Sequence, residues 1–251
     1  MLCFSPMNIV LTLSYDGTAY FGFQVAKSFA TVEASLQEVL EKILQKKVSL
    51  QAASRTDAGV HAEEQIVNFF LDSPRNLEQF HKSINQLLPK DIRVAKIHLA
   101  KDDFHPSLDA IGKEYHYRLT TASVQFPFDR LFAWHYSFPL DLKMMEQAAE
   151  FFIGKHDFKA FENISASKSK ETTCTLHRIS IIKKEGEIRF EIQGDRFLYK
   201  MVRNLVGTLV HVGVGKLSLK QAKELITSKD RTLGGMTAPA HGLLLKRVFY
   251  V

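Results

Sequence analysis

The apolar positions of the first hundred residues follow the period of a strand and the period of a helix in turn. Every second residue from Ile9 to Tyr15 is apolar, which predicts one face of a strand that ends at an Asp-Gly turn. After Thr31, a residue suited to cap a helix, apolar side chains recur at helical spacing as far as Leu44. The chain therefore begins with a strand followed by a helix.

The remaining elements of this half alternate in the same way. They are short apolar strands over residues 48–53 and 66–71, a helix from Leu77 to Leu88 that Pro89 stops, and a strand from Ile92 to Leu99. The order βαββαβ is that of a split-βαβ unit, in which an antiparallel sheet carries helices on one face.

The second half repeats this order. Alternation at Tyr115 and Tyr117 predicts its first strand, and Asp141 begins a helix that ends at Gly154. The later elements are strands over 176–182 and 188–193, helical spacing over 198–209, a helix after Ser218 with a capping box to Gln221, and a strand over 243–250. We therefore expect an α+β protein with two βαββαβ (ferredoxin-like, split-βαβ) halves, residues 1–105 and 106–251, whose antiparallel sheets associate around a central cleft.

The segment from Ser54 to Ala62 sets one carboxylate in a short polar turn between two strands. Asp57 follows Arg55 by two residues and precedes Gly59 by two. A carboxylate on such a turn is held by a rigid scaffold and stays open to a ligand, and Arg55 favours its ionised form. Asp57 is therefore a candidate nucleophile or base. The alternative is a structural Asx-turn in which Gly59 supplies a positive φ.

Composition is that of a soluble globular protein, with 251 residues of which 45% are hydrophobic and 24% charged. The longest apolar stretch, residues 205–214, is too short and too interrupted to span a bilayer, and the N-terminus lacks the pattern of a signal peptide. Two cysteines, Cys3 and Cys174, support neither a disulfide framework nor a thiolate zinc site. We expect a cytoplasmic protein.

Charge is divided unevenly along the chain, whose formal net charge is +6. Residues 1–110 hold 11 Lys and Arg against 13 Asp and Glu, whereas residues 111–251 hold 22 against 14. A basic half on a chain of this size favours a polyanionic partner. The alternative is that the lysines only keep exposed faces soluble.

Four residues outside Asp57 are candidates for a site. Tyr115 shares a strand face with Tyr117, which suits either a half-buried structural pair or a surface on which a base stacks. Arg203 lies in an otherwise apolar helix, where a buried arginine needs an anionic partner such as Asp57 or a phosphate. Arg55 could contact a phosphate or orient the turn. His61 is interpreted as a turn or core histidine, since no second histidine is placed with it.

Motifs for bound cofactors and metals are missing from the sequence. It has no Walker-type loop, no dinucleotide-binding glycine fingerprint after a strand and no helix with paired histidines. The aromatic consensus of an RNA recognition motif is also missing, although the topology is related. We therefore expect neither a cofactor nor a metal.

The sequence around Asp57 resembles the signature of the TruA-type tRNA pseudouridine synthases, and the resemblance extends in order over nearly the whole chain. Its order and spacing make it specific. The matching segments are Gly22-Phe23-Gln24, Thr31-Val32-Glu33, Arg55 to His61, Leu88 to Ile92, Phe104-His105, Lys113 to Tyr117, His156-Asp157-Phe158, Met201 to Asn204, Asp230-Arg231-Thr232 and Thr237 to Leu243.

Three residues depart from the family pattern. Phe23 stands where the family usually has tryptophan, and Ser54 stands where it usually has glycine. Ser107 replaces an arginine expected shortly after Phe104-His105, which removes a possible RNA contact.

The resemblance implies the pseudouridine synthase fold and an isomerisation that needs no cofactor. It implies that Asp57 is the catalytic carboxylate, kept ionised by Arg203 or Arg55, and that Tyr115 stacks on the uracil. The implied substrate is tRNA, at uridines of the anticodon stem-loop (positions 38, 39 and 40), and the target nucleotide must leave the helical stack. The resemblance also implies a homodimer.

Two other functions compete with this interpretation. A non-catalytic RNA-binding module would explain the basic half and the tyrosines, but it would leave the Asp57 loop without a purpose. A hydrolase that uses Asp57 as a general base lacks a second carboxylate or histidine at a recognisable spacing.

Overall fold

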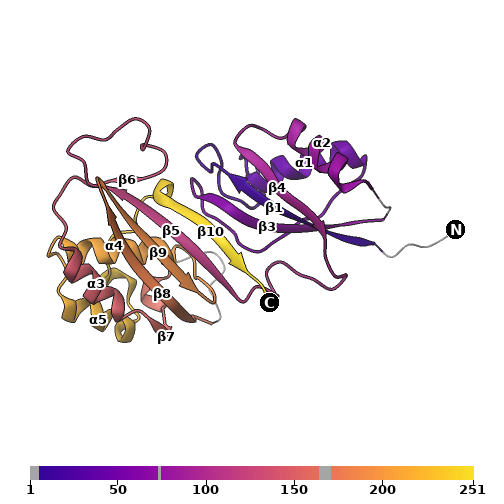
Figure 1. Cartoon of the computed structure of the whole chain (residues 1–251). Helices are drawn as coiled ribbons and strands as arrows, with labels where there is room; N and C mark the ends of the chain where they lie inside the picture. Colours follow the sequence, from indigo (N-terminus) through magenta and orange to yellow (C-terminus); the bar gives the residue numbers. More distant parts are fainter. Residues whose placement is uncertain (1–5, 73–74, 164–170) are drawn as a thin grey trace. The chain divides into compact units, whose positions relative to one another are not determined.

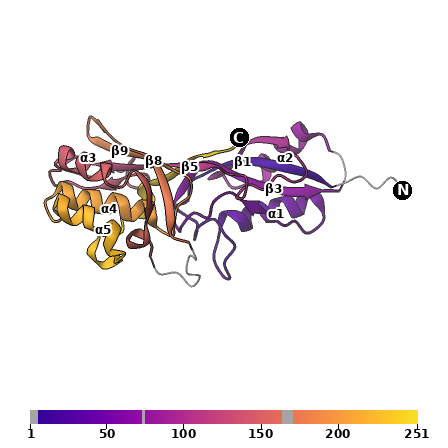
Figure 2. The same ribbon diagram turned by 90° about the horizontal axis from the view of Figure 1, so that it is seen from below.

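The computed structural model describes residues 6–72, 75–163 and 171–251 (Figure 1, and Figure 2 from below). The chain forms two compact units. The described residues up to Ile111, together with Leu245–Val251, make the first unit, and Gly112–Leu244 make the second. The C-terminal strand therefore belongs mostly with the first unit. The two halves expected from the sequence, residues 1–105 and 106–251, place this strand in the second half.

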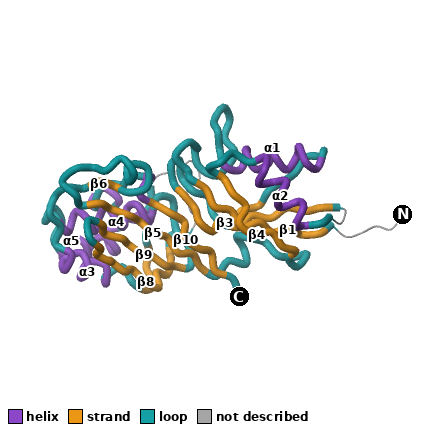
Figure 3. The backbone as a smooth tube through the Cα atoms, turned by 45° about the horizontal axis from the view of Figure 1, so that its top comes forward, coloured by secondary structure: helices purple, strands orange, loops and turns teal. Residues whose placement is uncertain are grey.

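The first unit has the split-βαβ arrangement that the sequence predicts. Its elements are β1 (Met7–Tyr15), α1 (Val32–Leu44), β2 (Gln51–Ala52), β3 (His61–Leu71), α2 (Leu77–Leu87), β4 (Ile92–Leu99) and most of β10 (Leu243–Phe249). The strand β1 lies between β4 and β3 and is antiparallel to both (Figure 1), and β2 is antiparallel to β3. Figure 3 draws β1, β3 and β4 in orange and the helices α1 and α2 in purple. The strand β10 also borders β3.

The first helix of this unit begins after its predicted cap, and the second begins at the predicted residue, Leu77. The Thr31 side chain accepts a hydrogen bond from the Ala34 amide, and Asn76 caps α2 in the same way. One stripe of α1, which includes Leu36 and Leu40, is fully buried. The cap residue and the apolar spacing that predict α1 therefore match its start and its buried face.

Two strand boundaries in this unit differ from the predicted ones. The predicted strand over 48–53 is reduced to Gln51–Ala52, because the backbone of Val48 is bonded to side chains of α1 instead of a neighbouring strand. Gln37 Nε2 donates to the Val48 carbonyl at 2.6 Å, and the Val48 amide donates to Glu41 at 3.2 Å. The strand β3 begins at His61, five residues before the predicted start at residue 66.

The second unit contains β5 (Gly112–Thr120), β6 (Trp134–His135), α3 (Leu142–Glu150), β7 (Gly154–Asp157), β8 (Thr173–Lys184), β9 (Glu187–Gly194), α4 (Met201–Gly213) and α5 (Leu219–Ser228). The strand β9 lies between β5 and β8 and is antiparallel to both. The strand β7 pairs with the far edge of β8, and the three helices lie together (Figure 1). The prediction of an α+β protein is confirmed.

The helix starts in this unit follow the predicted signals with one exception. Asp141 caps α3, and Ser218 forms the predicted capping box with Gln221. Helical spacing predicts that α4 begins at Leu198, but it begins at Met201, because Lys200 has a left-handed φ of 60° that interrupts the helical backbone. Within the described part of the chain, every helix is too short or too polar to cross a membrane.

Candidate active site

The Asp57 loop connects β2 to β3 in the first unit, and a turn shapes its tip. The Val60 amide donates to the Asp57 carbonyl at 3.1 Å, and Gly59 has a φ of 76°, which L side chains rarely adopt. Asp57 is half-buried, whereas Arg55 and Ala58 are exposed. Asp57 therefore lies at a half-buried position in a turn between two strands.

The segment that follows β1 supports this loop from one side. The Phe23 amide donates to the Thr56 carbonyl at 3.1 Å, and the Gly59 amide donates to the Tyr20 carbonyl at 3.2 Å. Gly22 has a φ of 88°, and a Cβ added there would lie 2.7 Å from the Thr56 carbonyl oxygen. Only glycine fits this close backbone approach without displacing the loop.

Side chains from two strands hold the start of the loop. The Thr56 hydroxyl lies 2.8 Å from the hydroxyl of Tyr15, and this contact is buried. Gln65 Nε2 donates to the Ser54 carbonyl at 2.6 Å, while the Ser54 amide donates to Gln65 Oε1 at 3.2 Å. These supports were missed at the sequence level, although a glutamine within an apolar strand was a usable signal.

His61 is a structural residue, in agreement with the prediction. It is buried at the first position of β3, and its Nδ1 accepts a hydrogen bond from the Gly17 amide at 3.0 Å. The same nitrogen lies 3.1 Å from Asp16 Oδ1. His61 therefore links the end of β1 to the end of the Asp57 loop.

Tyr115 and Tyr117 lie on one buried face of β5, as their alternation predicts. The Tyr115 ring is 7% exposed and meets Phe197 edge-on, with ring centroids 5.0 Å apart. The Tyr117 hydroxyl donates to the Pro239 carbonyl at 2.9 Å. Burial raises the pKa of Tyr117 far above its usual value, and the nearby charge of Arg203 only partly opposes this shift. Tyr117 is therefore a neutral core residue.

Arg203 lies in the first turn of α4, where it is half-buried. Its Nε donates to the Ala238 carbonyl at 2.7 Å, and the Ala238 amide donates back to the Arg203 carbonyl at 3.1 Å. This reciprocal pair ties the helix start to the segment around Ala238 and fixes the direction of the guanidinium. The structure thus places Arg55 and Asp57 together on one loop of the first unit, and Tyr115 and Arg203 in the second.

Lys113 is a further candidate for the site, to which the sequence alone assigns no role. It lies on β5 two residues before Tyr115 and on the same face of the strand. Burial lowers the pKa of its amine to about 8. The motif that contains it was visible in the sequence, but its burial was not.

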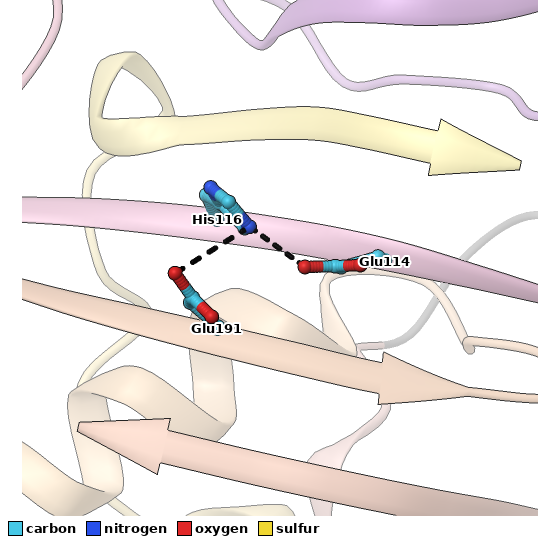
Figure 4. A group of neighbouring side chains, drawn as sticks. All are labelled: Glu114, His116 and Glu191. Carbon is cyan, nitrogen blue, oxygen red and sulfur yellow. Dashed lines mark hydrogen bonds and ion pairs between the residues drawn. The ribbon is translucent and has the colours of Figure 1, made fainter. Parts of the chain in front are cut away.

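A cluster on the other face of β5 has residue types that can bind metals. Glu114 and His116 come from β5 and Glu191 from β9, and Figure 4 shows the three side chains facing one another. His116 Nε2 lies 2.8 Å from Glu114 Oε1 and 3.9 Å from Glu191 Oε1. Arg178 contacts both glutamates, at 3.3 and 3.5 Å, and Arg189 contacts Glu191 at 3.0 Å. These arginines balance the carboxylates, so the cluster is a network of ion pairs across the sheet.

Comparison with known proteins adds to this geometry. The family model described as tRNA pseudouridine synthase matches residues 12–107 and 148–251. The chain belongs to that family. Arg55, Asp57 and Arg203 lie within the matched ranges, and Tyr115 lies between them.

Relatives in the tRNA pseudouridine synthase family match almost end to end. The protein named tRNA pseudouridine synthase A 2 of Protochlamydia amoebophila (strain UWE25) is 46% identical, over 98% of this chain and 95% of its own length. The tRNA pseudouridine synthase A of Thermoanaerobacter sp. (strain X514) is 40% identical, over 97% of this chain and 99% of its own length. A solved structure of a Cbf5-Nop10-Gar1 complex aligns at a TM-score of 0.40 and 13% identity, over 95% of this chain and 49% of that one.

Proposed function

We propose that this protein converts uridine to pseudouridine in tRNA, at uridines of the anticodon stem-loop (positions 38, 39 and 40). The observation that carries the proposal is the half-buried carboxylate of Asp57, on a loop that two strands and the segment after β1 hold in place. Membership of the tRNA pseudouridine synthase family supports it.

The chemistry explains why a carboxylate is needed. The bond between uracil N1 and ribose C1′ breaks and a bond between uracil C5 and C1′ forms, while C5 loses a proton and N1 gains one. Nothing is added or removed overall, so the protein has to supply a group that engages the ribose or the base, or removes a proton beside them. We assign this role to Asp57, which acts as a nucleophile at ribose C1′ or uracil C6, or as the base for a ribose proton.

The other predicted residues take binding roles in this proposal. Tyr115 provides a ring on which the uracil stacks, and Phe197 supports that ring at 5.0 Å. Arg203, whose Nε is held by the Ala238 carbonyl, binds an anionic group of the substrate. Arg55 is exposed on the loop and contacts the RNA backbone.

The remaining features of the proposal concern partners and location. The excess of 22 Lys and Arg over 14 Asp and Glu in residues 111–251 suits the phosphates of tRNA. We place the protein in the cytoplasm, where that tRNA is found, and infer that it works as a homodimer. Exposed apolar side chains at Val124, Phe126 and Phe128 support association with a second copy.

The decisive experiment maps pseudouridine in tRNA after incubation with the wild type and with Asp57→Asn. The amide has nearly the same shape but cannot act as a nucleophile or base, so we expect product to disappear while tRNA affinity is kept. Asp72→Asn is the matched control, because Asp72 is an exposed carboxylate of the same unit that pairs with Lys46. Turnover by Asp57→Asn would remove Asp57 from its role.

The same reaction mixtures separate the competing functions. An RNA-binding module would bind tRNA and yield no pseudouridine with either the wild type or the variant. A hydrolase would release free uracil, which chromatography detects. Either result would contradict the proposal.

A further inference from the structure

Two phenylalanine rings stand exposed on the loop between β1 and α1. Phe21 and Phe29 are each 54% exposed, and their rings stack on one another with centroids 4.3 Å apart and an angle of 16°. Val25, between them in sequence, is 51% exposed. This loop projects past α1 in Figure 2. Exposed apolar groups gathered on one projecting segment indicate a contact surface.

Backbone hydrogen bonds hold the loop that carries Phe21 and Phe29. The Phe21 amide donates to the Ala30 carbonyl at 2.8 Å, which closes the loop at its base. The Phe29 amide donates to the Ala26 carbonyl at 3.4 Å, across a tip in which Ser28 has a left-handed φ of 67°. These bonds order the loop backbone, and the stacking orders the two rings against each other, which reduces the entropic cost of binding.

The same loop is joined to the Asp57 loop on both sides of Phe21. The Tyr20 carbonyl accepts a hydrogen bond from the Gly59 amide at 3.2 Å, and Gly22 packs on the Thr56 carbonyl. Phe21 thus comes from the backbone segment that supports the proposed catalytic loop. The two exposed rings therefore belong to a segment that is bonded directly to the Asp57 loop.

The apolar area of the two exposed rings decides whether they suit a protein partner or a single nucleobase. Two half-exposed rings offer on the order of 200 Å² of apolar area, whereas a stable protein interface needs about 800 Å² on each partner. A single nucleobase has a flat apolar face that fits one ring. A nucleotide that leaves its helix also leaves a neighbouring base without a stacking partner.

We propose that the Phe21–Phe29 pair, named here the ring pair, stacks on a base of the tRNA that neighbours the uridine at Asp57. The inference rests on the proposed function and extends it, because it gives the enzyme a second aromatic contact besides Tyr115. Neither phenylalanine is among the residues that carry the family resemblance. The ring pair is a binding feature and takes no part in the bond changes.

The first test compares variants that keep the ring with variants that remove it. Phe29→Tyr should bind tRNA within about twofold of the wild type, whereas Phe29→Leu should bind on the order of tenfold more weakly. The loss should appear in KM, with kcat kept at saturating tRNA. Leu87→Ala is the control, because it removes exposed apolar area on α2, outside this loop, and its tRNA affinity should not change.

A second measurement does not depend on turnover. In Phe29→Trp the new indole is exposed, whereas the natural tryptophan, Trp134, is buried in the second unit. Addition of tRNA should quench the new fluorescence in a saturable way, also when Asp57→Asn is combined with it. Absence of quenching, or Phe29→Leu binding as tightly as Phe29→Tyr, would overturn the inference.

The outcomes for the two proposals are separable. If the wild type forms no pseudouridine in tRNA, the proposed function fails, and the fluorescence titration still decides whether a base stacks on the ring pair. If the leucine variant changes the sedimentation coefficient of the protein instead of its tRNA affinity, the ring pair contacts a second copy of the chain and the inference is wrong.

Discussion

Replacing Gly22 with alanine tests whether the segment after β1 sets the position of the Asp57 loop. Gly22 has a φ of 88°, and its added Cβ would lie 2.7 Å from the Thr56 carbonyl oxygen and 3.3 Å from the Ala58 amide nitrogen. Alanine costs about 1–2 kcal/mol in this backbone region, and crowding against a packed backbone costs about 1–3 kcal/mol more. We expect Gly22→Ala to lower the free energy of unfolding by about 2–5 kcal/mol.

The matched control is Gly186→Ala, in the turn between β8 and β9. Gly186 also has a positive φ, of 68°, but an added Cβ would meet nothing within 4 Å. Only the backbone cost of about 1–2 kcal/mol remains there. The difference between the two variants therefore isolates the contact between Gly22 and Thr56.

The assay combines chemical denaturation with pseudouridine formation at a temperature where both variants are folded. Because the Thr56 carbonyl directly precedes Asp57, a shift of the loop displaces the carboxylate, and a misplacement near 1 Å costs on the order of 100-fold in rate. Gly22→Ala should therefore lose activity while folded, whereas Gly186→Ala should keep it. Equal destabilisation by the two substitutions, with full activity in both, would refute the reasoning.

Two further predictions concern the substrate. The logarithm of tRNA affinity should fall linearly with the logarithm of salt concentration, because the excess positive charge lies in residues 111–251; an affinity that does not respond to salt would show that this charge serves solubility alone. Tyr115→Phe should keep most of the single-turnover rate and Tyr115→Ala should lose most of it, since a stacked base contributes roughly 1–3 kcal/mol; equal loss in two variants of normal thermal stability would mean that the hydroxyl takes part in proton transfer.

Signals that act within a few residues were readable from the sequence. The caps at Thr31, Asp141 and Ser218 predicted where three helices begin, because each cap satisfies amides in the turn that follows it. The turn at Asp57 and Gly59 was also predicted, because glycine adopts the positive φ found at Gly59 without strain. The assignment of catalytic and binding roles to Asp57, Tyr115, Arg203 and Arg55 stays a prediction that the proposed experiments test.

Strand ends that depend on residues far away in the chain could not be predicted from the sequence. The strand predicted over 48–53 is short because Gln37 and Glu41 of α1 take the hydrogen bonds of Val48, and neither side chain shows this use in its own sequence context. The start of β3 at His61 follows from antiparallel pairing with β1, in which Tyr15 faces Ala62. Each backbone amide and carbonyl has several possible hydrogen-bond partners, and the tertiary fold decides which of them comes within reach.

The sequence by itself determined the type and order of the main elements and marked one carboxylate for attention. The tertiary structure decided what surrounds that carboxylate: the buried contact from Tyr15, the amide of Gln65 and the close approach of Gly22. It also decided that Phe21 and Phe29 stack in the open. Periodicity and caps are local properties of the chain, whereas these contacts join residues that only the packing of strands and loops brings within a few ångströms.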